Sequence, residues 1–470
     1  MPHDPFIELL AHAAEALEAE FGSLPKFEPQ LGADAEAMAQ VLEETAHRLG
    51  DNYPYFHPLY AGQMLKPPHP IARAAYALAM KINPNNHARD GGRASSEMEM
   101  EAVSEIAAMI GWAGVGSAGV GLSGSRGSFL GHLTSSGTLA NLEALWVAGQ
   151  LGQESGTGRR IVGSGQAHYT HNRISAVLKL EFAAIRPDNR GRMCLEALEQ
   201  ELRKGDVGTV VATLGTTALG AVDPLEEILA LRETYGFRIH VDAAYGGYFG
   251  LIADSLDEPA RRAYASIRHA DSIVIDPHKH GLQPYGCGCV LFRDPGVGQL
   301  YKHDSPYTYF TSNELHLGEI SLECSRAGAA AVALWATQQL LPLTPDGEFA
   351  RGLRRCRAAA VALDQLLRED SRFEPLAAGA PELDIVVWKV KANRAEVASE
   401  LAQQVFNSCA ARDLHLALVR LPASWFCSGD PQKSEIVTCL RSVLMKPEHD
   451  QWLSRIWDRL SAATGESIPD

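Results

Sequence analysis

Short apolar runs alternate with longer amphipathic stretches from about residue 60 to about residue 345. The runs IVGSG, FAAIRP, TVVATLG, RIHVDAA and SIVIDPH have the length and composition of strands. Stretches between them, such as LEALEQELRKG and LEEILALRETYG, have the apolar spacing of helices. This alternation predicts an α/β domain over residues 59–345, with a mostly parallel central sheet flanked by helices.

The two ends of the chain follow other patterns. Residues 1–58 predict an N-terminal helical segment, in which Phe6, Leu9 and Leu10 share one face and Val41 and Leu42 share another. An amphipathic pair of helices with little around it to pack on is expected to dock on a larger body or on a partner subunit. Beyond the Pro-rich joint LLPLTPDGEF, helices and strands alternate again and predict a small C-terminal α+β domain over residues 346–470.

Composition and charge restrict the function classes. Of the 470 residues 46% are hydrophobic and 21% charged, as in ordinary globular proteins. The formal net charge of -15 argues against a broad surface for nucleic acid or anionic membranes. The acidic N-terminus does not resemble a signal peptide, and the eight cysteines lack a CxxC spacing, which favours free thiols. We therefore expect a soluble cytoplasmic protein, although the charge says nothing about a substrate.

The stretch DSIVIDPHKHGLQPYGCG places Lys279 just after an apolar strand. A lysine in such a position is costly unless its ammonium is paired or solvated. Either a turn solvates the lysine, or its amine is used in chemistry.

Other polar groups also follow predicted strands, where open α/β sheets bind their ligands. Ser136, Gly137 and Thr138 open a helix and form either a phosphate cradle or an ordinary helix cap. Thr217 follows another strand, where its hydroxyl binds a ligand or satisfies a turn. Asp242 lies among small apolar residues and needs a charged or hydrogen-bonding partner.

An amine, a carboxylate and an anion cradle together are what pyridoxal phosphate requires of a protein. His168, which follows the strand IVGSG, is placed to stack on the pyridine ring of such a cofactor. His168 and His171 form an HxxH pattern, and His278 and His280 an HxH pattern, but no third ligand has metal-site spacing. We expect no metal.

The ordered motifs Ser136-Gly137-Thr138, His168, Thr217, HVDAAYGG and DPHK resemble the group II pyridoxal-phosphate-dependent amino acid decarboxylases. That family includes the aromatic amino acid, glutamate and tyrosine decarboxylases. The segments HPLYAGQM and SSEMEME resemble its N-terminal motifs, so that the resemblance spans about residues 55–345. It implies fold type I of the aspartate aminotransferase superfamily, and a homodimer whose sites the partner subunit completes.

The resemblance also implies residue roles. Lys279 would form the Schiff base with the cofactor, Asp242 would pair with the pyridine nitrogen, and His168 would stack on the ring. The remaining cofactor contacts would come from Ser136, Gly137, Thr138, Thr217, Ala244 and His278. The expected reaction is decarboxylation of an L-amino acid to its amine.

Two regions depart from the family pattern. The family's proton donor is a loop tyrosine, for which Tyr307 and Tyr309 are both candidates here. Because neither tyrosine can be chosen, decarboxylation coupled to oxidative deamination stays open, as does a carbon–carbon lyase reaction. The segment NPNNHARDGGRASSE departs where the substrate side chain is selected, and candidate substrate residues there and downstream are Asn85, Asn86, His87, Arg89, Ser96 and Arg326.

Overall fold

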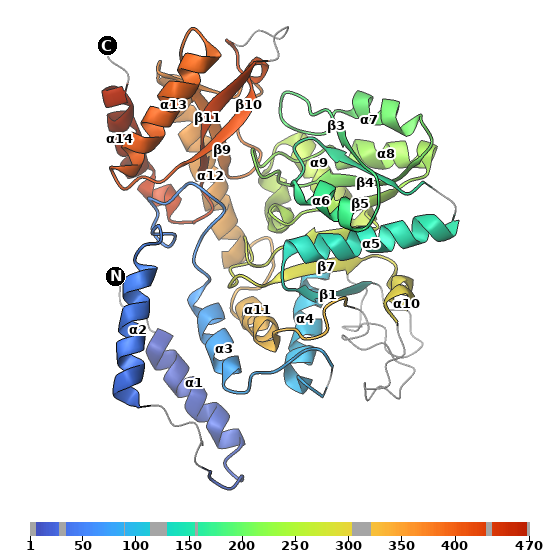
Figure 1. The fold of residues 1–470 in the computed structure, drawn as a ribbon, viewed down its shortest axis with the longest axis vertical. Helices are drawn as coiled ribbons and strands as arrows, with labels where there is room; N and C mark the ends of the chain where they lie inside the picture. Colours follow the sequence, from blue (N-terminus) through green and yellow to red (C-terminus); the bar gives the residue numbers. More distant parts are fainter. Residues whose placement is uncertain are drawn as a thin grey trace.

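The computed structural model describes residues 6–27, 34–88, 90–112, 129–155, 158–302, 321–428 and 435–467. A seven-stranded sheet in the order β1-β7-β6-β5-β4-β2-β3 forms the main body (Figure 1). Its strands are β1 (Leu130–Thr134), β2 (Arg160–Ser164), β3 (Phe182–Ile185), β4 (Val207–Thr213), β5 (Arg238–Asp242), β6 (Ser272–Ile275) and β7 (Gly288–Phe292). Only β7 runs antiparallel to its neighbours, which confirms the mostly parallel sheet.

Helices cover both faces of this sheet because the side chains of each strand alternate between the two faces. In β6, Val274 packs with α5 (Gly137–Ser155), while Ile273 and Ile275 face the opposite core. The helices α5 and α6 (Thr170–Val177) cover one face. The other face packs against α4 (Arg93–Met109), α7 (Leu195–Leu202), α8 (Leu225–Tyr235) and α9 (Glu258–Ser266).

A second, antiparallel sheet of four strands in the order β10-β11-β9-β8 forms the C-terminal part. Its central residue Trp388 is completely buried among side chains of three helices. The strands are β8 (Phe373–Pro375), β9 (Ile385–Val390), β10 (Ala417–Pro422) and β11 (Ile436–Val443), and the helices are α12 (Glu348–Glu369), α13 (Ala395–Ala410) and α14 (His449–Ser467). The sequence pattern predicted these helices and three of the strands, but not β8, which is only three residues long.

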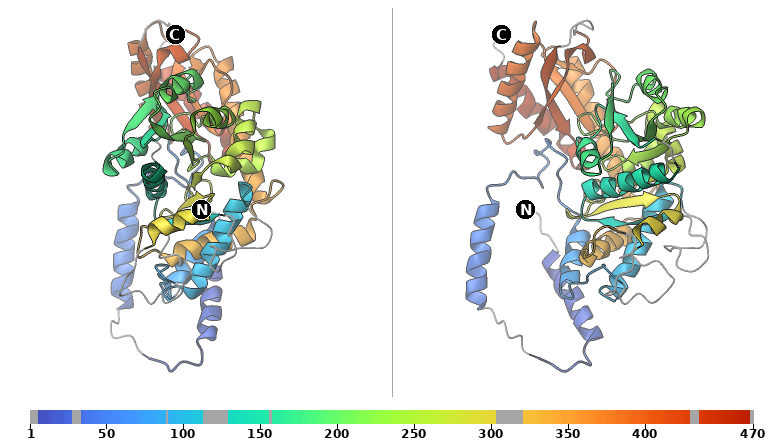
Figure 2. Two further views of the ribbon diagram at one scale, coloured as in Figure 1. Left: turned by 90° about the vertical axis from the view of Figure 1, so that its right-hand side faces the viewer. Right: turned by 45° about the vertical axis from the view of Figure 1, so that its right-hand side comes forward.

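The N-terminal helices α1 (Phe6–Glu20) and α2 (Ala35–Leu49) extend away from the main body (Figures 1 and 2). α1 packs against α3 (Pro70–Met80), and α11 (Gly328–Leu340) contacts both α3 and α4. α2 has no buried residue. The apolar face predicted for this helix is therefore present but uncovered.

A short helix, α10 (Gly298–Tyr301), lies after β7 in the chain. None of the helices in the described ranges combines the length with the apolar character that crossing a bilayer requires. All eight cysteines are free thiols, as the sequence predicted.

Candidate active site

Five strands of the large sheet, β1, β2, β4, β5 and β6, end at the same edge, because β7 lies between β1 and β6 and runs antiparallel to both. A cavity of about 180 Å³ lies at this edge. It is lined by every residue that the sequence assigned to the cofactor: Ser136, Gly137, Thr138, His168, Thr217, Asp242, Ala244, His278 and Lys279. Residues without such an assignment complete the lining: Asn141, Thr170, Thr213, Gly215, Tyr245 and Asp276.

Lys279 lies in the turn after β6, and its amine is paired with a carboxylate. Its Nζ lies 3.1 Å from Oδ2 of Asp276, which is almost completely buried. The backbone N–H of Lys279 donates to the carbonyl of Asp276 in the same turn. The side chain of Lys279 is 22% exposed, so the ammonium is only partly withdrawn from water. It lies at the cavity with the carboxylate of Asp276 as its counter-ion.

His278 is oriented by the neighbouring strand. Its Nδ1 lies 2.6 Å from the carbonyl oxygen of Cys287, so Nδ1 carries the proton and donates it there. Its Nε2 lies 3.5 Å from Oδ2 of Asp276. Nε2 is therefore on the side of the ring that faces the carboxylate of Asp276.

The start of α5 has the shape of an anion cradle. Ser136 caps the helix, since its Oγ accepts a hydrogen bond from the N–H of Leu139 at 3.2 Å. A Cβ atom on residue 137 would collide with the carboxylate of Asp276, so only glycine allows this close approach. The helix cap, one of the two alternatives from the sequence, is present, and the phosphate cradle stays a prediction.

Asp242 lies at the end of β5, where both of its carboxylate oxygens accept hydrogen bonds. Oδ1 accepts from the N–H of Ala244 at 3.1 Å, and Oδ2 lies 2.8 Å from Nε2 of His171. Burial favours the neutral acid, but the hydrogen bond and the charge of Lys279 outweigh it and lower the pKa of Asp242 below its usual range. Asp242 is therefore ionised at neutral pH.

His168 stands at the cavity between β2 and α6. Its Nδ1 lies 2.8 Å from the hydroxyl of Thr170. Burial lowers the pKa of the imidazole, and the nearby Lys279 lowers it further. The ring is neutral at physiological pH and presents a flat surface to the cavity.

Thr217 belongs to a turn that the small sheet holds in place. Arg441 of β11 is buried, and its Nη2 donates to the carbonyl of Thr217 at 2.6 Å while its Nε donates to that of Ala218. Gly215 begins this turn with a φ of +97°, which favours glycine. Arg441, which was not identified from the sequence, therefore holds this turn of the cavity wall in place.

The cavity fits pyridoxal phosphate in its donor set and shape. A lysine amine, an ionised carboxylate and the start of a long helix lie on its walls. Two buried oxygens near them, Thr213 Oγ1 and Asp276 Oδ1, have no hydrogen-bond partner among the described residues. Such oxygens are consistent with a polar ligand in the space between these groups.

None of the five described candidate substrate residues, Asn85, Asn86, His87, Ser96 and Arg326, is in the lining of this cavity. Asn85 instead joins two loops, because its Oδ1 accepts from the N–H groups of His87 and Arg326. Ser96 is buried within α4. Tyr307, Tyr309 and Arg89 lie outside the described residues, so the structure does not bear on their roles.

Arg326 is engaged within the protein. Its Nη1 lies 2.5 Å from Oε1 of the buried Glu99 and also donates to the carbonyl of Leu133, while Nη2 donates to the carbonyl of Asn86. The charge of Arg326 is compensated by Glu99 in this arrangement, and its binding of a substrate carboxylate stays a prediction. Its guanidinium ties β1 and α4 to the start of α11.

Glu143 of α5 anchors the chain on both sides of residues 303–320. Its Oε2 accepts from the hydroxyl of Tyr301 at 3.1 Å, and its Oε1 lies 3.4 Å from the backbone nitrogen of Leu322. His132 also approaches Oε2, at 2.9 Å. The described ends of the segment that contains both candidate tyrosines are therefore fixed to the helix that forms the cradle.

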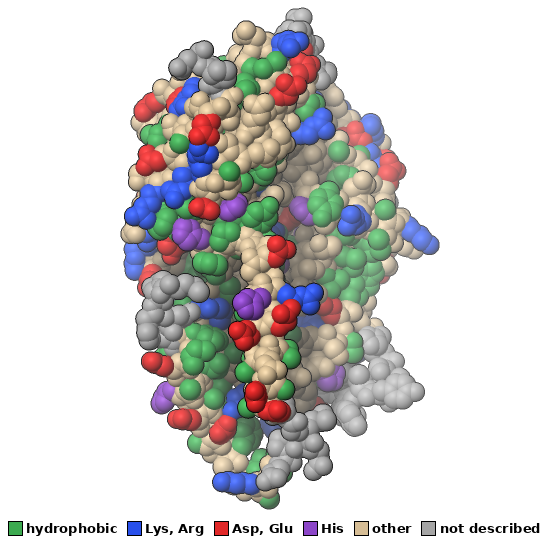
Figure 3. Space-filling model, turned by 60° about the vertical axis from the view of Figure 1, so that its left-hand side comes forward, with side chains coloured by type: hydrophobic (Ala, Val, Ile, Leu, Met, Phe, Trp, Pro, Cys, Tyr) green, Lys and Arg blue, Asp and Glu red, His purple; other side chains and the backbone are tan. Residues whose placement is uncertain are grey.

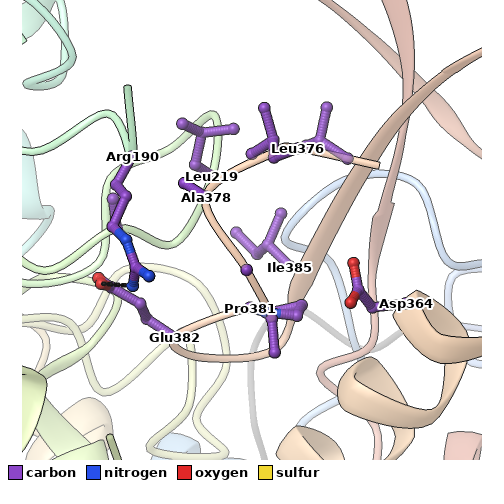
Figure 4. A pocket seen from close by; sticks show the side chains of 12 residues that line it. Arg190, Leu219, Asp364, Leu376, Ala378, Pro381, Glu382 and Ile385 are labelled. Atoms are coloured by element: carbon purple, nitrogen blue, oxygen red, sulfur yellow. Dashed lines mark ion pairs between the residues drawn. The ribbon is translucent and has the colours of Figure 1, made fainter. Parts of the chain in front are cut away.

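A separate cavity of about 40 Å³ lies where the small sheet meets the loop after β3 (Figure 4). Glu382 and Arg190 meet there at 4.0 Å, and Glu382 also accepts from the N–H of Val222. This space is too small for an amino acid. The described residues contain no group of three or more side chains that could hold a metal ion.

The model of the family described as "Pyridoxal-dependent decarboxylase conserved domain" matches residues 23–391. The chain therefore belongs to the pyridoxal-dependent decarboxylase family, as the motifs indicated, and its cofactor is pyridoxal phosphate.

The curated relatives have different substrates. The L-tyrosine decarboxylase of Enterococcus faecium is 27% identical over 422 residues, which cover 68% of this chain and 66% of that protein. The L-2,4-diaminobutyrate decarboxylase of Rhizobium meliloti is 32% identical over 272 residues, covering 55% of this chain and 52% of that protein. The chain thus spans no more than about two thirds of the length of these relatives.

A solved structure supports the fold over the whole chain. The crystal structure of Oryza sativa TDC with PLP and tryptamine aligns with a TM-score of 0.78 and covers 100% of this chain and 99% of that one. Its sequence is 18% identical, so this likeness establishes fold type I and nothing about the substrate.

We predict that Arg326→Met destabilises the protein by about 3 to 5 kcal/mol, because it leaves the buried carboxylate of Glu99 without its charged partner. The double variant Glu99→Gln, Arg326→Met should recover part of that loss. Urea unfolding of the three proteins measures the effect. If Arg326→Met keeps the stability of the parent protein and only raises KM, Arg326 binds the substrate instead.

Proposed function

We propose that the protein uses pyridoxal phosphate to decarboxylate an L-amino acid to the corresponding amine. The observation that carries this proposal is the single cavity that holds Lys279, Asp242, His168 and the start of α5. Family membership supports the reaction type, and the geometry supports the residues. In the structure these groups line one cavity, a relation that the motifs alone do not reveal.

Each wall of the cavity has a proposed task. Ser136, Gly137, Thr138 and His278 hold the phosphate, Lys279 holds the cofactor covalently, and Asp242 keeps a proton on the pyridine nitrogen. When bound, the cofactor supplies a ring that withdraws electrons from the carbon that loses carbon dioxide. His168 and Ala244 contact the ring and keep it in place. A loop tyrosine, Tyr307 or Tyr309, returns a proton to the substrate carbon.

The proposal is tested with a panel of amino acids assayed for carbon dioxide, amine, ammonia and peroxide. Amine and carbon dioxide in equal amounts are expected for at least one L-amino acid. Aldehyde with ammonia and peroxide would establish the oxidative alternative, and cleavage without carbon dioxide would establish a carbon–carbon lyase.

We also propose that the protein is a cytoplasmic homodimer, divided at residues 58/59 and 345/346 into the three parts expected from the sequence. The uncovered apolar face of α2 supports the dimer, because Val41 and Leu42 are 65% and 68% exposed. Figure 3 shows the face of the molecule on which apolar and acidic side chains lie exposed together. The free thiols support a reducing compartment.

We predict that Lys279→Ala abolishes the covalent link between protein and cofactor. Borohydride reduction followed by peptide mapping should locate the cofactor on Lys279 in the parent protein and on no peptide of the variant. Lys391→Ala, at an exposed lysine outside the cavity, is the control and should keep the link. Cofactor found on another lysine of the parent would refute the assignment.

We predict that phenylalanine at one of the two loop tyrosines lowers amine formation by ~10² to 10⁴-fold, the usual contribution of a positioned general acid. Tyr307→Phe and Tyr309→Phe should both keep the absorbance of the bound cofactor. The variant that loses the donor should also raise the yield of aldehyde and peroxide. Parent rates in both variants and in the double variant would mean that another group, such as His168, delivers the proton.

We predict that Val41→Glu with Leu42→Glu converts the dimer to monomers, because two carboxylates would enter an apolar interface. Light scattering gives the mass in solution. Gln40→Glu, which adds a charge to the polar face of α2, should leave the dimer intact. A parent protein that is monomeric and fully active would end the dimer proposal.

A further inference from the structure

His171 is a buried residue next to the cofactor cavity that the expected site does not use. It is the second residue of α6 and has no solvent exposure. Its Nε2 lies 2.8 Å from Oδ2 of Asp242. From the sequence, His171 is considered only as a candidate metal ligand, in the HxxH pattern with His168. The described residues contain no group of three or more ligands that could hold a metal ion.

The carboxylate of Asp242 is fixed by two donors from different elements. The N–H of Ala244 holds Oδ1 at 3.1 Å, and His171 approaches Oδ2 from α6. A carboxylate offers about four acceptor positions, so each oxygen retains one. The carboxylate is thereby immobilised, while acceptor capacity remains for a group in the cavity that Asp242 lines.

The surroundings of His171 determine its protonation. Its Nδ1 is buried and has no hydrogen-bond partner among the described residues. A charged imidazolium would place a second N–H there, where the described structure offers no acceptor. The neutral form with its proton on Nε2 satisfies Asp242 and leaves only a weak acceptor unpaired.

Other ionisable groups lie around the pair of His171 and Asp242. The ring of His240 lies 6.3 Å away and bonds to Ser272 and Asn141 instead of Asp242. Burial lowers the pKa of His240 to about 3, so it is neutral as well. His168 and Lys279 stand on the cavity side, and the ammonium of Lys279 disfavours a further positive charge there. Asp242 is the one carboxylate to which His171 bonds in the described structure.

We propose that His171 is a positioning residue that holds Asp242 as a neutral donor, so that the charge of the carboxylate is kept for the pyridine nitrogen of the cofactor. A lysine or arginine in its place would form an ion pair and compete with the ring for the same charge. A leucine would leave the carboxylate buried with one fixed donor fewer. This inference rests on the proposed role of Asp242.

The test follows the ring nitrogen directly, in holoenzyme loaded with pyridoxal phosphate that carries ¹⁵N in the ring. The ¹⁵N shift against pH gives the pKa of the ring nitrogen. His171→Leu and His171→Phe, which lack the donor, should lower this pKa by about one unit or more, because a buried Asp242 with one donor fewer takes up a proton more readily and then no longer pairs with the protonated ring. His171→Gln, which restores a neutral donor, should stay closer to the parent than either.

Ser175→Ala is the matched control. Ser175 is buried on the same helix one turn later, and its hydroxyl has no hydrogen-bond partner in the described structure. Its removal should leave the ring-nitrogen titration unchanged. Variants without the donor that titrate like the parent would overturn the proposal, while the absence of any covalent cofactor in the parent would instead refute the proposed function.

A second measurement on the parent protein does not depend on whether the variants fold. Neutron diffraction at neutral pH should show deuterium on Nε2 of His171 and none on Nδ1. Deuterium on both nitrogens would identify an imidazolium and overturn the proposal, since His171 would then neutralise Asp242.

Discussion

The alignment of parallel strands is the constraint on which the rest of the structure depends. Strands that run in one direction end at one edge, so residues far apart in the sequence meet there. The amine of Lys279 and the carboxylates of Asp242 and Asp276 reach the same small cavity in this way. Each of these charges would be costly alone in the interior, and each has a partner among the groups that the alignment brings close.

The sequence predicted the large sheet well because its strands are short apolar runs bounded by polar residues. The residues that it proposes for the cofactor line one cavity; Ser136 was proposed from a motif at a strand end, and His278 from the family resemblance. It could not predict contacts that depend on tertiary structure. Nothing near Arg326 in the sequence indicates Glu99, and nothing near Thr217 indicates Arg441.

Hydrogen bonds from outside the cavity position several of its residues. Arg441 fixes the turn of Thr217 from the small sheet, His171 fixes Asp242 from α6, and the carbonyl of Cys287 orients His278 from the beginning of β7. These supports come from three parts of the chain. These three residues of the cavity lining are therefore held by the protein itself.

The two contacts of Glu143 allow the chain between them to vary in evolution. Both described ends of residues 303–320 are tied to this one side chain on α5. The free-energy cost of closing a loop rises only slowly with its length. A connection of another length between Tyr301 and Leu322 would therefore cost the fold little, provided that Glu143 keeps both contacts.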